Sequence, residues 1–238
     1  MSIEFIEIPL WYCVVIICFL LMIVFLIQYK RRESLQRPFF LGLSIFMLGY
    51  GIARLIENIR RYSIGSYNDI LDAWKTGTQI VGLNFWLRIL YYAIAWAMIA
   101  MFYYNIEKNI FKKNKFLLTI CALVEGVLSI TIYFYFNDIV FWASVFNFFI
   151  VGFFIPILFL NLAMKTPSGS IRNGCILISI GMLLFVLGVM IDLPESSYFM
   201  YLLGQEVPED LIRITTPIIL IMGLLSFSIG FKTFFPKE

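Results

Sequence analysis

Seven long apolar segments constrain the fold of this chain more than any other feature of its sequence. An α-helix rises about 1.5 Å per residue and the hydrocarbon core of a bilayer is about 30 Å thick, so roughly 20 apolar residues cross it once. The segments of this length are 8–29, 38–61, 79–106, 115–136, 139–163, 172–193 and 210–232. They predict an all-α integral membrane protein, a single seven-helix membrane domain over residues 1–238, surrounded by the lipid bilayer.

The composition excludes several other classes of protein. Hydrophobic residues make up 61% of the chain and charged residues 14%. The short connections between the segments cannot hold a soluble catalytic or DNA-binding domain, so we predict no nucleic-acid partner. The net charge of +3 therefore concerns the orientation of the chain in its membrane.

Basic residues predict that orientation, because they concentrate in alternate connections. One side of the membrane receives Lys30, Arg31, Arg32, Arg37, Lys108, Lys112, Lys113, Lys115, Lys165, Arg172, Lys232 and Lys237. The connections on the other side contain mostly acidic residues, and their basic residues are Arg60, Arg61 and Lys75. The positive-inside rule then predicts an N-terminus outside and a cytoplasmic C-terminus, in the plasma membrane. Acids precede the first segment and KRR follows it, which is typical of a retained stop-transfer helix.

Histidine is absent from the sequence, and the four cysteines, Cys13, Cys18, Cys121 and Cys175, all lie in apolar segments. We therefore predict free thiols, no metal site and no His-based catalysis. The segments also lack the paired aspartates or Ser/His pair of intramembrane proteases, so we predict no enzymatic activity and no cofactor. The topology resembles that of opsins, but Lys232 lies at the inner end of the last segment, where it could not hold retinal.

An internal repeat is suggested by polar residues that recur at a constant spacing. A shift of 135 positions aligns Arg37 with Arg172, Ser44 with Ser179 and Glu57 with Asp192, and a shift of 125 then aligns Arg88 with Arg213. This predicts a 3+1+3 parallel repeat: repeat one 8–106, a linker helix 115–136, and repeat two 139–232. Convergent membrane composition is the alternative explanation.

The 3+1+3 order resembles that of SWEET sugar transporters and the related KDEL receptor. The resemblance is one of topology, because the proline–glutamine dipeptide of that group is absent. Pro9 is followed by Leu10, and Pro156 is followed by Ile157. No residue roles are transferred from it.

Five charged residues within the segments form the candidate site: Arg54, Glu57, Arg88, Asp192 and Arg213. One interpretation is structural, with inter-helix salt bridges from Glu57 to Arg88 and from Asp192 to Arg213. The other is a water-filled cavity for a small anionic or zwitterionic ligand, since guanidinium groups bind carboxylates and phosphates in a bidentate way. Arg54 is the asymmetric member, because Val189 occupies the matching position.

Glu125 lies near the middle of segment 115–136, where a charged carboxylate costs about 3 kcal/mol. Two interpretations stay open for it. It is a proton-coupling site, or it is a neutral acid that hydrogen-bonds to a neighbouring helix.

The leading functional hypothesis is a small transporter with an outward-facing charged cavity. The alternative is a ligand-sensing receptor, or a membrane subunit that acts through a partner protein docked on the basic cluster 112–115. The long connection 66–81 forms either a short interfacial helix or a loop.

Overall fold

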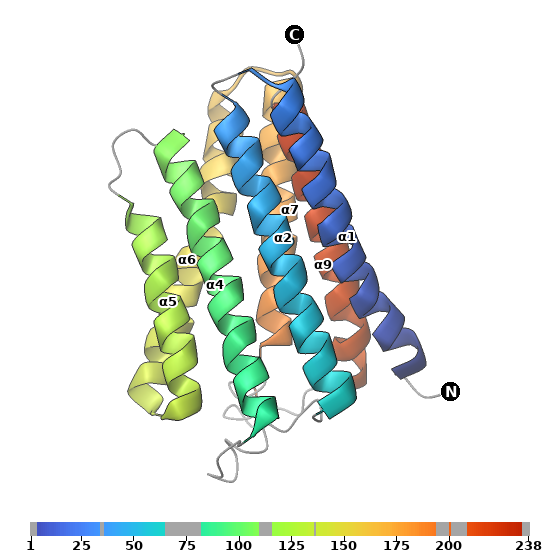
Figure 1. Ribbon diagram of the computed structural model, residues 1–238. Helices are drawn as coiled ribbons and strands as arrows, with labels where there is room; N and C mark the ends of the chain where they lie inside the picture. The colour runs from blue at the N-terminus through green and yellow to red at the C-terminus, as the bar shows by residue number, and fades with distance from the viewer. Residues whose placement is uncertain are drawn as a thin grey trace. The chain divides into compact units, whose positions relative to one another are not determined.

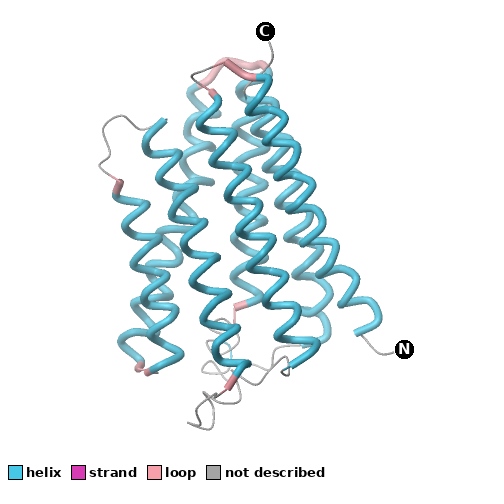
Figure 2. The backbone as a smooth tube through the Cα atoms, in the orientation of Figure 1, coloured by secondary structure: helices cyan, strands magenta, loops and turns pink. Residues whose placement is uncertain are grey.

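The computed structural model describes residues 4–33, 36–64, 82–109, 116–135, 137–193, 200 and 209–234, and these form helices and short connections (Figure 1 and Figure 2). The elements are α1 (Glu4–Arg31), α2 (Arg37–Ile59), a π-helical turn η1 (Arg60–Ile64), α4 (Leu83–Asn109), α5 (Leu117–Phe134), α6 (Asp138–Lys165), α7 (Ser170–Asp192) and α9 (Glu209–Phe234).

Among the described residues, seven helices, α2 and η1 counting as one, are long and apolar enough to cross a membrane, in agreement with the seven predicted segments. All four cysteines are free thiols, as predicted. The predicted orientation stays a prediction. The predicted features at 66–81 and 112–115 lie outside the described residues.

The chain forms two compact units, residues 15–148 and residues 1–14 with 149–238. Their boundaries differ from those of the predicted repeats, and the duplication stays a prediction. Each unit is described here by itself.

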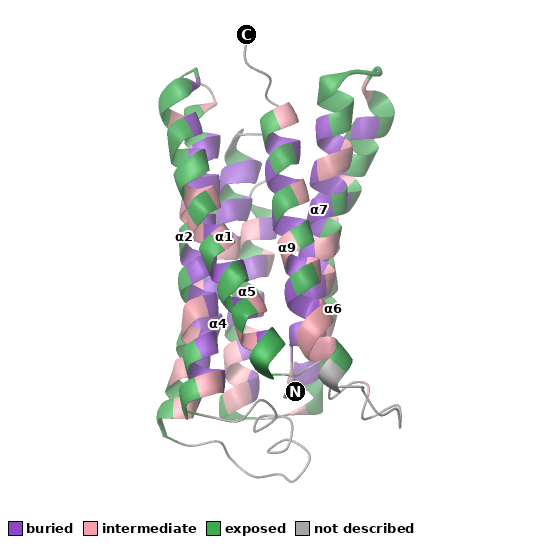
Figure 3. Cartoon of the chain, turned by 90° about the vertical axis from the view of Figure 1, so that its right-hand side faces the viewer, coloured by how far each residue is buried: buried purple, intermediate pink, exposed green. Residues whose placement is uncertain are grey.

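Residues on the exposed face of α2 are apolar, as a membrane environment requires. Leu48, Ile52 and Ile59 are each between a third and a half exposed, while the opposite face is buried. Figure 3 shows this division of buried and exposed residues along the helices. Water would not stabilise such a face, whereas lipid chains solvate it.

Small residues bring the helices of the 15–148 unit close together. Ser44 donates a hydrogen bond to the Met22 carbonyl of α1 at 3.0 Å. A Cβ atom placed on Gly51 would lie 3.1 Å from the Cβ of Cys18, and one on Gly49 would overlap the side chain of Met98 on α4. Gly49 and Gly51 thus allow α2 to approach the neighbouring helices closely.

A side chain near the end of α4 caps the start of α5. Glu107 is buried and accepts hydrogen bonds from the backbone N–H groups of Leu118 and Thr119 at 2.7 and 3.1 Å, and from the Thr119 hydroxyl at 2.6 Å. These are N–H groups of the first turn of α5, which have no acceptor within their own helix. The carboxylate also opposes the positive end of the α5 dipole, so it fixes where α5 begins.

Glycines dominate the contact between α7 and α9 in the other unit. A Cβ on Gly181 would overlap the backbone N of Phe227, and one on Gly174 would lie 2.5 Å from the N of Phe234. On α9, a Cβ on Gly230 would lie 2.6 Å from the N of Ile178. The two helices therefore meet backbone against backbone.

Candidate functional site

Glu57 is the centre of a buried group of arginines in the 15–148 unit. It is 1% exposed, and its carboxylate accepts hydrogen bonds from Arg60 and Arg61, one turn later on the same helical stretch. The Arg60 Nε lies 3.0 Å from Oε2 and the Arg61 Nε lies 2.7 Å from Oε1. Arg88 of α4 forms a further ion pair with Oε1. We call Glu57, Arg60, Arg61 and Arg88 the arginine cluster.

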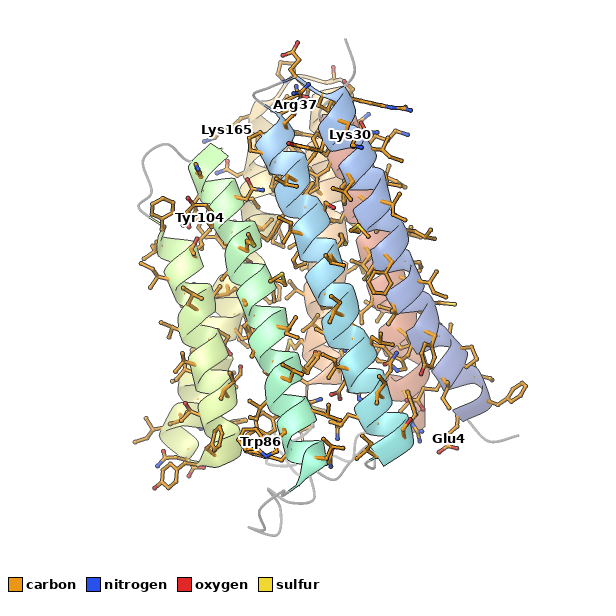
Figure 4. The ribbon with its side chains drawn as sticks, viewed as in Figure 1. Glu4, Lys30, Arg37, Trp86, Tyr104 and Lys165 are labelled. Atoms are coloured by element: carbon orange, nitrogen blue, oxygen red, sulfur yellow. The ribbon has the colours of Figure 1, made fainter. Side chains whose placement is uncertain are left out.

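The Glu57–Arg88 contact joins two helices, as the structural interpretation of the sequence predicted. Neighbouring polar groups hold the cluster in place. Asn84, at the start of α4, accepts a hydrogen bond from Arg60 Nη1 at 2.8 Å. The cluster thus lies near the end of α4 that carries Trp86, away from Tyr104 (Figure 4).

Tyrosine rings surround the Arg88 guanidinium. Its carbon lies 4.9 Å from the ring centre of Tyr92, 5.3 Å from that of Tyr91 and 5.9 Å from that of Tyr133. Its Nη2 donates to the Tyr92 hydroxyl at 3.2 Å, and that hydroxyl lies 3.0 Å from the Tyr133 hydroxyl. Ring faces attract a cation, so these contacts stabilise the charge of Arg88 while leaving part of its hydrogen-bonding capacity unused.

Arg54 is fully buried one turn before Glu57. Its Nε donates to the Tyr50 hydroxyl at 2.8 Å, and its guanidinium lies 5.5 Å from the ring centre of Tyr91. Arg54 and Arg88 therefore both contact the Tyr91 ring. The structure places Arg54 beside the arginine cluster, in contact with aromatic groups.

Buried donors next to Glu57 and within the arginine cluster lack a hydrogen-bond acceptor among the described residues. They are the Nε of Arg88 and the Nδ2 of Asn58, the residue after Glu57. Both residues are almost completely buried, at 2% and 1% exposure. A buried N–H group without an acceptor costs roughly 1–3 kcal/mol, so each of these donors would gain from an oxygen acceptor.

Asp192 and Arg213 belong to the other unit. Arg213 forms a salt bridge with the fully buried Glu7, with an Nη2–Oε2 distance of 2.6 Å, and its Nη2 is 4.0 Å from the exposed Glu4. Asp192 is buried at the end of α7. The predicted Asp192–Arg213 pair stays a prediction, and Glu7 is a partner of Arg213 that the sequence analysis did not identify.

Glu125 is also buried, and three neutral polar side chains hydrogen-bond to its carboxyl group. The hydroxyls of Ser144 on α6 and Ser129 on α5 lie 2.5 and 3.3 Å from Oε1, and the Asn147 amide donates to Oε2 at 2.9 Å. The predicted hydrogen bonding to a neighbouring helix is confirmed. Proton coupling by this residue is an untested prediction.

Sequence reasoning missed Arg60 and Arg61 because it counted them as charges of an outer connection. The structure instead buries both side chains and turns them back onto Glu57. Their spacing of three and four residues from Glu57 is the signal that could have identified them, since such residues share a helical face.

Metal binding has no support in the described part of the chain, where no group of three or more Cys, Asp or Glu side chains could hold an ion. Comparison of the chain with protein-family models, curated proteins and solved structures finds no match. The candidate site is therefore interpreted from its own residues.

Proposed function

We propose that this protein is a plasma-membrane transporter for a small anionic or zwitterionic solute, which binds at the arginine cluster. The observation that carries the proposal is that two buried donors, Arg88 Nε and Asn58 Nδ2, lack acceptors among the described residues. Arg88 pairs with Glu57, whose carboxylate already binds three arginines, and Asn58 is the residue after Glu57. A carboxylate or phosphate group of a solute would supply the acceptor oxygens that these donors lack.

The chemistry of guanidinium supports an anionic group in particular. Each guanidinium has five N–H donors in a fixed plane, and two of them can bind the two oxygens of a carboxylate or phosphate. Arg88 uses Nη1 on Glu57 and Nη2 on Tyr92, so its Nε edge is the side on which a ligand oxygen would add. The ammonium group of a zwitterion would in turn be attracted to Glu57.

Arg54 is a further proposed binding residue of the 15–148 unit. Arg54 adds a positive charge beside the cluster through the shared Tyr91 ring. Asp192 and Arg213 are a separate charged set in the other unit, carried by α7 and α9, and solute binding by them is a separate proposal for that unit.

Uptake by the full-length protein in lipid vesicles tests the proposal. A panel of radiolabelled monocarboxylates, dicarboxylates, organic phosphates and amino acids is offered, and at least one is expected to accumulate. Arg88→Ala should weaken binding of that solute by about 30-fold or more, which corresponds to about 2 kcal/mol. Arg88→Lys should give an intermediate loss, because lysine keeps the charge without the planar donor pair.

Lys108→Ala is the matched control, since it removes one positive charge from the exposed far end of the same helix. It should leave binding unchanged. Unaltered uptake in Arg88→Ala would contradict the proposed site. Saturable binding without flux in the wild type would support the receptor alternative instead.

A further inference from the structure

A second polar site occupies the interior of the α5–α6 hairpin in the 15–148 unit. Glu125 is 1% exposed and its carboxyl group contacts Ser129, Ser144 and Asn147. We propose that this group is a reversible proton-binding site, in which Glu125 takes up and releases one proton within the membrane.

The two serine hydroxyls make both protonation states of Glu125 compatible with the same geometry. A hydroxyl can donate one hydrogen bond and accept others. When Glu125 is ionised, the Ser144 hydroxyl donates to Oε1 across the 2.5 Å contact. When a proton binds to Oε1, the same hydroxyl rotates and accepts it. The added proton forms an O–H bond on Oε1, and the hydrogen bond donated by Ser144 is replaced by one donated to Ser144 across the same contact.

Asn147 holds the other oxygen of the carboxyl group. Its Nδ2 donates both to Oε2 and to the Cys121 carbonyl of α5, each at 2.9 Å. Because both partners are acceptors, the amide nitrogen must face them. Oε2 therefore accepts a hydrogen bond from Asn147 whether Glu125 is ionised or protonated. We assign the exchangeable proton to Oε1, the oxygen that contacts the two serine hydroxyls.

The helices packed around Glu125 bring few other titratable groups to this level. Gly126 packs against Trp96, and residues 95–100 of α4 are alanine, tryptophan, methionine and isoleucine. Residues 139–148 of α6 include no acid, base, tyrosine or cysteine, and Asp138 is exposed at the start of that helix. Cys121, one turn earlier on α5, is the titratable neighbour on the same helix. Arg88 and Glu107 of α4 contact Glu57 and the start of α5, respectively.

The use of this site rests on the proposed function. In a transporter, a carboxyl group that alternates between charged and neutral states can couple proton movement to solute movement. The proton site itself does not depend on solute, so it can be tested separately.

Infrared difference spectra of the solute-free, lipid-reconstituted protein test the proton site, because the C=O stretch of a protonated carboxyl absorbs separately from that of a carboxylate. Subtraction of the Glu125→Gln spectrum should isolate one band that appears and disappears reversibly with pH. Ser144→Ala keeps the carboxyl group but removes a hydrogen bond, so the same band should move to higher frequency. That second variant keeps the test valid if Glu125→Gln folds poorly.

Three results would overturn the proton site: no band that distinguishes the wild type from Glu125→Gln, a band that is constant over the whole pH range, or a band controlled by sodium concentration. Coupling is then measured in vesicles under a pH gradient. Glu125→Gln should retain solute exchange when the pH is equal on both sides. Its solute accumulation driven by the pH gradient should be at least tenfold lower than that of the wild type. Equal accumulation in both proteins would overturn coupling, and absence of any uptake by the wild type would count against the proposed transport while leaving the infrared result intact.

Discussion

At the residue scale, Glu57 has the most demanding environment in the described part of the chain. A buried carboxylate is costly unless it is paired and hydrogen-bonded, and Glu57 is paired with three arginines. The arginines depend on it in return, because all three side chains are at least nine-tenths buried. Removing the carboxylate would leave three guanidinium groups in a site from which water is largely excluded.

Glu57→Ala should therefore destabilise the protein by about 3–5 kcal/mol, the cost of breaking a buried ion pair on one side. Unfolding of the purified protein in mixed micelles measures this difference. Glu4→Ala is the control, since Glu4 is 64% exposed and its nitrogen–oxygen distance to Arg213 is 4.0 Å. Its effect should stay below about 1 kcal/mol. Equal stability of Glu57→Ala and the wild type would mean that the cluster does not stabilise the fold.

The sequence predicted the Glu57–Arg88 contact correctly but not the whole cluster. Charged side chains near the end of an apolar segment were predicted to face water. This rule holds when no oppositely charged residue lies within reach inside the segment. Arg60 and Arg61 depart from it because Glu57 lies within one helical turn. The contacts of Glu125 could not be predicted as specific pairs, since Ser144 and Asn147 reach it from another helix.

At the element scale, helix bounds were predicted to within a few residues. Segment 8–29 becomes α1 over Glu4–Arg31, a helix that extends past the apolar stretch at both ends. Segment 38–61 extends through the π-helical turn to Ile64. The length of an apolar segment thus predicts a membrane helix well. The residue at which the helix ends depends on tertiary contacts such as those of Arg60.

The α7–α9 pair shows why glycine positions matter more than overall hydrophobicity in this fold. Between helices surrounded by lipid, association depends on close packing instead of the hydrophobic effect. Gly174, Gly181 and Gly188 recur every seven residues on α7, as do Gly223 and Gly230 on α9. Every second turn of each helix can therefore approach the backbone of the other.

Gly181→Ala should destabilise the 149–238 part of the protein by about 1–3 kcal/mol, because its Cβ would overlap the Phe227 backbone and force the helices apart. Thermal unfolding in detergent measures the effect. Ile180→Ala is the neighbouring control, since that side chain is 47% exposed and its truncation leaves the helix contact intact. A melting temperature of Gly181→Ala equal to that of Ile180→Ala would show that the close contact is not required.

At the scale of the whole molecule, an odd number of membrane crossings sets a simple constraint. If each of the seven helices that are long and apolar enough in the described residues crosses the membrane once, the two termini must lie on opposite sides of it. The positive-inside rule then favours one of the two orientations, because Lys30 and Arg31 end α1, Arg32 follows it and Lys165 ends α6. Figure 4 shows Lys30 and Arg37 together at one end of the α1–α2 hairpin.

We accordingly predict that the N-terminus is outside and the C-terminus is cytoplasmic, and cysteine labelling in intact cells checks this. The four native cysteines are replaced by serine or alanine, and single cysteines are introduced as Glu4→Cys and Lys237→Cys. A membrane-impermeant maleimide should label the first variant in intact cells and the second only after the membrane is opened. The same accessibility at both positions would contradict seven spans, and the reverse pattern would show that the positive-inside rule fails for this chain.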